Sequence, residues 1–151
     1  VVIGDGDNEE EAVMRLGRIG FDNAVGYLKD GMEALNNHPE LIRKVSRITA
    51  AALAEQVSSK TKPFVLDVRS EKEYRGGHIP GGHNIPVNHL RDRLSQIPLD
   101  RPIVVHCEGG YRSAIAASLI AETGRRDVWD LVGGIKAWHA SKLPVEISAA
   151  S

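Results

Sequence analysis

Cys107 is the single cysteine of the chain, and its type and surroundings point to covalent chemistry. It follows an apolar run at residues 102–106 and precedes a loop that contains Gly109, Gly110 and Arg112. The alanine-rich residues 112–123 are expected to form a helix directly after this loop. N–H groups in the first turn of a helix have no partner within the helix, and with the helix dipole they favour negative charge. We therefore predict a stabilised thiolate, which is the nucleophilic form of cysteine.

The loop after Cys107 predicts a two-step transfer of sulfur. Gly109 and Gly110 are expected to permit turns that aim consecutive N–H groups inward, and Arg112 adds a fixed cation. Cys107 would attack the outer sulfur of a donor and become a persulfide, from which an acceptor thiolate or other nucleophile would remove that sulfur. The alternative is that Cys107 is a small buried core residue without a catalytic role.

Strands that alternate with helices must position this loop. Strands are expected at residues 64–68, 102–106 and 128–132, and helices at 50–54, 71–74, 90–97 and 112–123, with a last one opened by Gly133-Gly134. Residues 76–86 are too rich in Gly, Pro and His for regular structure. The pattern predicts an α/β fold with a central parallel sheet flanked by helices, in which ligands bind beyond the carboxyl ends of the strands.

Residues 1–45 predict a separate small unit. A strand is expected at 1–3, a helix at 9–19, a strand at 23–28 and a short helix at 31–35. This part holds nine acids and five bases, a net charge of -4, whereas residues 46–151 hold eleven acids and fourteen bases, a net of +3. About 45 residues is near the lower limit for an independent core.

Composition excludes several classes of protein. The 151 residues are 42% hydrophobic and 26% charged, which is typical of a soluble globular protein and not of a disordered one. A net charge of -1 gives no basic excess, so neither nucleic acid nor a membrane is expected as a partner. Cys107 has no partner for a disulfide, so we expect a cytoplasmic location.

Several ordered motifs make residues 46–148 resemble a rhodanese domain, the sulfurtransferase fold, with residues 149–151 as a tail. The motifs are Leu66-Asp67-Val68-Arg69, Glu73-Tyr74, Gly77-His78-Ile79-Pro80-Gly81, Asn84-Ile85-Pro86, Cys107-Glu108-Gly109-Gly110-Tyr111-Arg112-Ser113 and Gly133-Gly134-Ile135-Lys136-Ala137-Trp138. The resemblance implies sulfur transfer with Cys107 as nucleophile. Cys107 to Arg112 is six residues, the sulfurtransferase length, while the related dual-specificity phosphatases have one more.

The same resemblance implies roles for the surrounding residues. Backbone N–H groups of the loop would bind the anion, Arg112 would bind the donor and Arg69 would assist. Asp67, Glu73 and His78 are interpreted as structural support, the first two in an ion-pair cluster with Arg69. The loop residues expected to bind the substrate or anion are Glu108, Gly109, Gly110, Tyr111, Arg112 and Ser113.

The histidines suggest a metal site only on first inspection. His78, His83, His89 and His106 fit no compact ligand spacing, so no metal and no cofactor is expected in this chain. His106 should point away from Cys107, because side chains alternate along a strand.

Glu108 makes the loop less basic than free thiosulfate, a dianion, would favour. We therefore weigh a bulkier persulfide donor, such as glutathione persulfide, or a protein donor.

The first 45 residues resemble the second half of another rhodanese domain, without a cysteine at the matching loop. The alternative is an unrelated helical linker. A degenerate unit before an active one resembles the C-terminal region of metallo-β-lactamase-fold/rhodanese fusions of the persulfide dioxygenase type. That resemblance implies an upstream metal-binding domain and makes this chain a fragment of a multidomain enzyme; none of the metal chemistry belongs to residues 1–151.

Two other functions remain open at this point. One is a non-catalytic docking or regulatory module of a metallo-β-lactamase-fold hydrolase or persulfide dioxygenase. The other is phosphatase or arsenate-reductase chemistry on the same fold, which the short loop disfavours. The expected partners are a small sulfur donor and a thiol acceptor, and the sequence leaves open whether the chain forms a homo-oligomer.

Overall fold

The computed structural model describes residues 1–4, 7–18, 20, 23–42, 44–60 and 62–147. The chain divides into two compact units, Val1–Lys44 and Val45–Ser151. Each unit is described by itself. No helix in the described part of the chain is long and apolar enough to cross a membrane.

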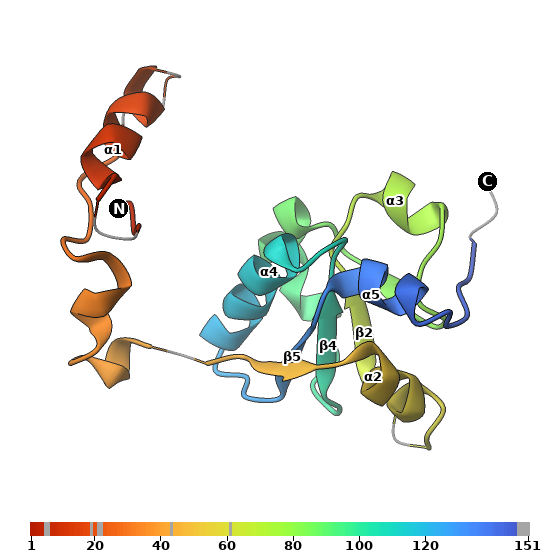
Figure 1. Ribbon diagram of the computed structural model, residues 1–151. Coiled ribbons are helices and arrows are strands. Elements are labelled where there is room, and N and C mark those ends of the chain that lie inside the picture. The colour runs from red at the N-terminus through yellow and green to blue at the C-terminus, as the bar shows by residue number, and fades with distance from the viewer. Residues whose placement is uncertain (5–6, 19, 21–22, 43, 61, 148–151) are drawn as a thin grey trace. The chain divides into compact units, whose positions relative to one another are not determined.

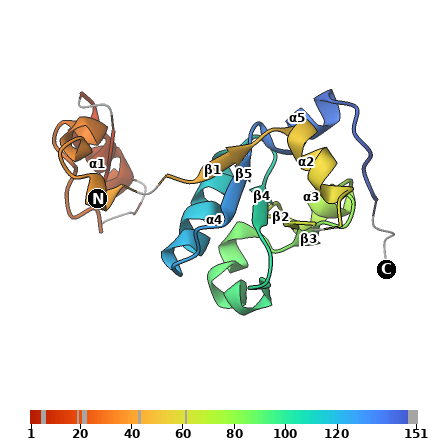
Figure 2. The same ribbon diagram turned by 90° about the horizontal axis from the view of Figure 1, so that it is seen from below.

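The second unit is built on a sheet of five parallel strands in the order β1-β5-β4-β2-β3 (Figures 1 and 2). The strands are β1 (Ser46–Ile48), β2 (Phe64–Asp67), β3 (His83–Asn84), β4 (Ile103–His106) and β5 (Val128–Leu131). Every residue of β2 and β4 is buried, as expected for apolar strands covered on both faces. The α/β class and the central parallel sheet are confirmed.

Helices cover both faces of this sheet (Figure 2). On one face α4 (Tyr111–Glu122) packs with two 3₁₀ segments, Val87–His89 and Arg91–Gln96, against side chains such as Leu66 and Val105. On the other face α2 (Ala50–Val57) and α5 (Gly134–Ala140) pack against Val65 and Val104. The alternation of neighbouring strand residues between the two clusters follows from the two-residue period of a strand.

Local signals explain where α2 and α3 begin. The Thr49 side chain accepts a hydrogen bond from the Ala52 N–H, as a residue that caps a helix does. Ser70 and Glu73 form a capping box at the start of α3 (Glu71–Arg75).

The segment 90–97 and the loop 76–86 differ from expectation. Instead of an α-helix at 90–97, the structure has a 3₁₀ segment with i→i+3 hydrogen bonds such as Arg93 N–H to the Leu90 carbonyl. Leu90 and Ile97 are both buried at the two ends of a short connection, which favours the tighter helix. The loop 76–86 contains β3, and β1 was not expected; both strands are too short to leave a clear pattern.

Among its described residues, the first unit has one α-helix, α1 (Glu9–Arg18). The expected strands at 1–3 and 23–28 reduce to one parallel bridge between Val2 and Tyr27. The short helix at 31–35 is a 3₁₀ segment, Gly31–Leu35. Ile19, the expected last residue of the first helix, lies outside the described residues. The resemblance of this unit to half a rhodanese domain stays a prediction.

Candidate active site

Cys107 lies directly after β4, at the carboxyl edge of the sheet. Only 1% of the residue is exposed, and it forms the end of the core cluster on the α4 face. Its sulfur nevertheless contacts polar groups. The Gly110 N–H donates to Sγ at 3.1 Å, and Ser113 Oγ lies 3.6 Å from Sγ while donating to the Gly110 carbonyl at 3.0 Å.

Helix α5 fixes the direction of the loop. The Ile135 N–H donates to the Cys107 carbonyl at 2.9 Å, and the Lys136 N–H donates to the Glu108 carbonyl at 3.2 Å. In a planar trans peptide the C=O and the N–H point in opposite directions. The N–H groups of Glu108 and Gly109 are therefore turned away from α5, toward the interior of the loop.

Gly134 makes this contact between α5 and the loop feasible. A Cβ at this position would collide with the carbonyl oxygens of Cys107 and Glu108, and φ is +58°. Any other residue would push the loop away from α5 or strain the backbone. Sequence reasoning recognised Gly133-Gly134 only as the start of a helix and missed this role.

The pKa of the Cys107 thiol is lowered from its ordinary value. Burial raises this pKa, but hydrogen bonds from the Ser113 side chain and from the backbone N–H groups of Ser113, Gly110 and Gly109 outweigh burial. A thiolate that accepts several hydrogen bonds is favoured over the neutral thiol.

The two glycines of the loop are not equivalent. Gly110 has φ +120°, a conformation that residues with a side chain rarely adopt. Gly109 has no such φ, and a Cβ there would meet open space. The expectation that the loop needs glycine is therefore supported for Gly110 and not for Gly109.

Arg112 is held by an acid from another element. Its two terminal nitrogens donate to the two carboxylate oxygens of Glu73 at 2.9 and 2.8 Å, and Glu73 also accepts from Ser70 at the start of α3. Arg112 lowers the pKa of Glu73 to about 2, and Glu73, helped by Cys107, raises the pKa of Arg112. Glu73 was expected beside Arg69, but it instead positions the cation of the loop.

Arg69 lies behind the loop, with 4% of the residue exposed. Its guanidinium donates to both carboxylate oxygens of Asp67 and to the Gly77 carbonyl, at 2.6 to 3.0 Å. Its remaining terminal nitrogen is 3.7 Å from the Glu108 carboxylate. The described contacts of Arg69 are thus to protein groups, and they connect β2 to the side chain of Glu108.

The other loop side chains face outward. Glu108 is 43% exposed, and besides Arg69 it lies 3.9 Å from Lys136 Nζ. Tyr111 is 83% exposed. The backbone N–H groups of residues 108–113 that surround Cys107 Sγ are called the ring below. Glu108 and Tyr111 can contribute to this ring only through their backbone N–H groups, whereas the buried Ser113 contributes its hydroxyl as well.

His78 and His106 have structural environments. The His78 ring stacks on Tyr74 with centroids 3.9 Å apart, and its Nδ1 is 3.0 Å from the Tyr74 carbonyl. His106 is fully buried, with Nδ1 3.4 Å from the Cys107 carbonyl and Nε2 3.7 Å from Asp67. Burial lowers the pKa of His106, which favours a neutral ring. Within the described residues no three His, Cys, Asp or Glu side chains are grouped as metal ligands.

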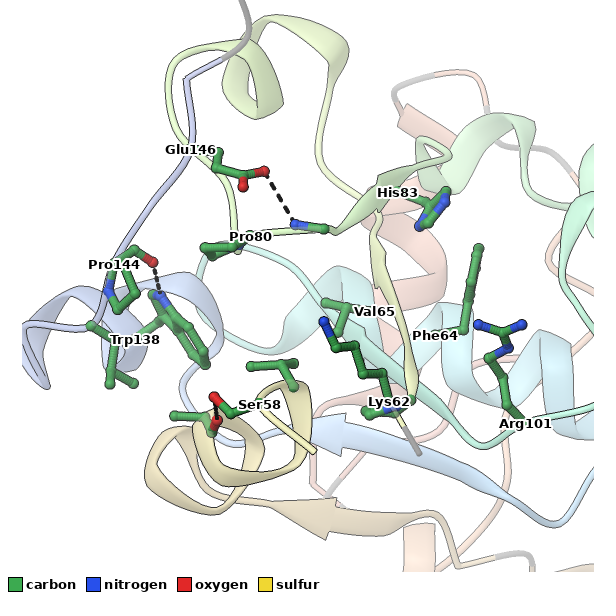
Figure 3. A pocket seen from close by; sticks show the side chains of 15 residues that line it. Ser58, Lys62, Phe64, Val65, Pro80, His83, Arg101, Trp138, Pro144 and Glu146 are labelled. Atoms are coloured by element: carbon green, nitrogen blue, oxygen red, sulfur yellow. Dashed lines mark hydrogen bonds between the residues drawn. The ribbon is translucent and has the colours of Figure 1, made fainter. Parts of the chain in front are cut away.

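The sulfur site and a larger cavity lie at opposite ends of β2. That cavity, of about 560 Å³, has Phe64 and Val65 from the start of β2 among its lining residues (Figure 3). Figure 3 shows Trp138 and Pro144 at one end, joined by a hydrogen bond, and the stacked rings of Phe64 and His83 at the other. No residue of the loop 107–113 lines it, so the chemistry of Cys107 has its own location at the carboxyl edge.

The fold and the loop define a class of protein: a parallel α/β sheet that presents a cysteine before the first turn of a helix. Comparison with protein families matches residues 49–141 to the family described as Rhodanese-like domain. The match covers more than half of the chain, and this chain belongs to that family.

Relatives and solved structures agree with this assignment. The chain is 39% identical over 84 residues to thiosulfate sulfurtransferase GlpE of Shewanella oneidensis, covering 56% of this chain and 83% of the relative. It is 38% identical over 77 residues to the uncharacterized protein YqhL of Bacillus subtilis, covering 51% of this chain and 61% of that relative. A crystal structure of a rhodanese-related protein from Thermoplasma volcanium matches with a TM-score of 0.63 and 33% identity, over 68% of this chain and 99% of that chain.

Proposed function

We propose that this protein is a sulfurtransferase that moves sulfane sulfur from a thiosulfate or persulfide donor to a thiol acceptor through a persulfide on Cys107. The observation that carries the proposal is the hydrogen bond from the Gly110 N–H to Cys107 Sγ, in a loop whose neighbouring carbonyls are held away by α5. The sulfurtransferase named among its relatives supports the same chemistry.

The proposed reaction has two displacements. The Cys107 thiolate attacks the outer sulfur of the donor, a new S–S bond forms, and the donor leaves with the electron pair of the broken bond as sulfite or as a thiolate. An acceptor thiolate then attacks the outer sulfur of the Cys107 persulfide, and Cys107 leaves as a thiolate. The ring of N–H groups stabilises the negative charge in each state, and no metal or organic cofactor is required.

Mass spectrometry of the intact protein tests the proposal. After incubation with thiosulfate or a persulfide and removal of the donor, we expect the mass to increase by one sulfur atom. Cys107→Ser should show no increase, and addition of a thiol should return the wild-type protein to its original mass. No adduct with any donor would overturn the proposal.

We also propose that a persulfide is a better donor than thiosulfate. Glu108 places an acid beside Cys107, and its pairing with Arg69 and Lys136 at 3.7 and 3.9 Å leaves it 43% exposed. Thiosulfate carries two negative charges on the small group that contains the reacting sulfur, whereas a persulfide group carries one at most, so this carboxylate repels the reacting end of thiosulfate more strongly. Turnover with glutathione persulfide should exceed turnover with thiosulfate, and a much higher efficiency with thiosulfate would contradict this part.

One observation favours a second candidate function, a docking or regulatory module. Cys107 is almost entirely covered, and a module that only binds a partner needs no accessible sulfur. Alkylation by iodoacetamide distinguishes the two functions: rapid modification of the native protein supports the enzyme, and modification only after unfolding supports the docking module.

The upstream metallo-β-lactamase-fold domain of the wider resemblance is part of the proposal as well. It rests on the order of the motifs in residues 1–148. The sequence of the full-length gene product tests it, because that sequence either contains the ligand residues of such a domain before residue 1 or does not.

A further inference from the structure

A hollow of about 360 Å³ adjoins the sulfur site. One wall is the segment from Val68 to Glu71 that follows β2, and the other is the 3₁₀ segment Val87–His89. The Val87 N–H donates to the Val68 carbonyl at 3.2 Å, which fastens the two walls together. This volume is in the lower range of small-molecule sites.

Arg112 connects this hollow to Cys107. It lines the hollow and belongs to the loop that begins at Cys107. Val68, another lining residue, donates its N–H to the His106 carbonyl, directly before Cys107, at 3.0 Å. A guanidinium has five N–H donors, and Glu73 takes two of them. The remaining donors can serve the Cys107 sulfur and a group bound beside it.

The lining carries both signs of charge. Glu71 is an exposed acid of this lining, and it forms a loose ion pair of 3.8 Å with Arg75. Asn88 and Arg112 also line the hollow. The Asn88 amide nitrogen lies 3.2 Å from the His89 ring, and amide and guanidinium N–H groups both suit a carboxylate. An acid and hydrogen-bond donors in one lining match a ligand that has an ammonium and a carboxylate together.

We propose that this hollow binds the amino-acid end of the sulfur acceptor, so that the preferred acceptor is a small thiol with both an ammonium group and a carboxylate. Arg112 and Asn88 bind the carboxylate, and Glu71 binds the ammonium group. The inference rests on the proposed function, since it names the acceptor class for the persulfide of Cys107. In the transfer, the acceptor thiolate forms an S–S bond to the outer sulfur, and the Cys107 thiolate is released.

Single-turnover transfer with three acceptors tests the proposal. The protein is loaded with persulfide and freed of donor, and then cysteine, cysteamine or 3-mercaptopropionate is added at matched thiolate concentration. Cysteamine lacks the carboxylate and 3-mercaptopropionate lacks the ammonium group. We expect cysteine to remove the sulfur fastest, because it alone of the three has both the carboxylate and the ammonium group that the hollow binds.

Two variants should change this preference in opposite ways. Glu71→Gln should slow cysteine and cysteamine by about threefold and leave 3-mercaptopropionate unchanged, as for loss of an exposed ion pair. Asn88→Asp should slow cysteine and 3-mercaptopropionate by about fivefold relative to cysteamine, because the new carboxylate repels theirs.

Glu122→Gln is the matched control for Glu71→Gln. The two acids are alike in exposure and pairing: Glu122 is 68% exposed and 3.8 Å from Arg91, and Glu71 is 64% exposed and 3.8 Å from Arg75. Glu122 is the last residue of α4 and does not line the hollow. The control should leave all three rates unchanged. Equal slowing of the three thiols in Glu71→Gln and Asn88→Asp, or no slowing, would overturn the acceptor site. Absence of persulfide in the wild-type protein would instead overturn the proposed function.

Discussion

Helices α1 and α4 differ in the negatively charged group that lies at the positive end of the helix, its N-terminus. Helix α1 begins after Val2, which forms a bridge with Tyr27, and α4 begins after β4. The first turn of α1 contains Glu9, Glu10 and Glu11, and the Glu9 carboxylate packs against Gly4. The first turn of α4 contains no acid, and Cys107 Sγ lies among its N–H groups instead.

This difference separates a structural helix start from a chemical one. Acids in a first turn stabilise the helix by interaction with its dipole and unpaired N–H groups. In α1 the helix supplies this negative charge from its own side chains. In α4 no acid of the first turn occupies this end, and hydrogen bonds from Ser113, Gly110 and Gly109 lower the pKa of the Cys107 thiol. Three substitutions test this difference between the two helix starts.

The largest effect is expected from Gly134→Ala. The new Cβ would collide with the backbone carbonyls of Cys107 and Glu108, so the ring would lose its shape. We expect a loss of stability of about 1–3 kcal/mol, typical of overpacking, and little persulfide formation. Urea unfolding measures the loss of stability, and mass spectrometry measures persulfide formation. Gly17→Ala in α1 is the control, because a Cβ there meets nothing within 4 Å. A fully active Gly134→Ala would refute the role of α5.

Ser113→Ala should have the next largest effect. It removes the hydroxyl that accepts from the Cys107 thiol and that donates to the thiolate once it turns from the Gly110 carbonyl. A hydrogen bond to a charged group is worth about 1.5–3 kcal/mol, so the pKa of Cys107 should rise by about one unit or more. The rate of iodoacetamide alkylation against pH reports this pKa, and its midpoint should move to higher pH. Ser118→Ala on the same helix, which loses only a bond to the Ala114 carbonyl, should leave the midpoint unchanged. An unshifted alkylation profile in Ser113→Ala would contradict the claim that Ser113 stabilises the Cys107 thiolate.

The smallest effect is expected from Tyr111→Glu, which gives α4 an acid in its first turn as in α1. Tyr111 is 83% exposed, so packing should not change. A charge near a helix end contributes about 0.3–1 kcal/mol, which corresponds to a rise of about half a unit in the pKa of Cys107. Tyr111→Gln is the neutral control in the same alkylation assay. Equal profiles for the two variants would mean that the dipole contributes little here.

The sequence predicted the main strands and the place of Cys107 because these depend on local patterns. The apolar run before Cys107 is long enough to indicate a buried parallel strand, and glycine and proline mark the connections. The same reasoning was wrong about residues 90–97, where burial of Leu90 and Ile97 selects a 3₁₀ segment over an α-helix. It also missed β3, whose two residues are defined by pairing with β2 and not by their own pattern.

The amino-acid sequence was enough to indicate that one cysteine ends a buried strand and precedes a helix, because strand burial and helix formation follow from residues close together in the chain. The groups that surround the sulfur are visible only in the folded protein. Glu73 holds Arg112 across 39 residues, and Gly134 lets α5 bind the carbonyls of Cys107 and Glu108. Such contacts depend on how the sheet brings distant segments to one edge, and the spacing of residues along the chain does not encode that distance.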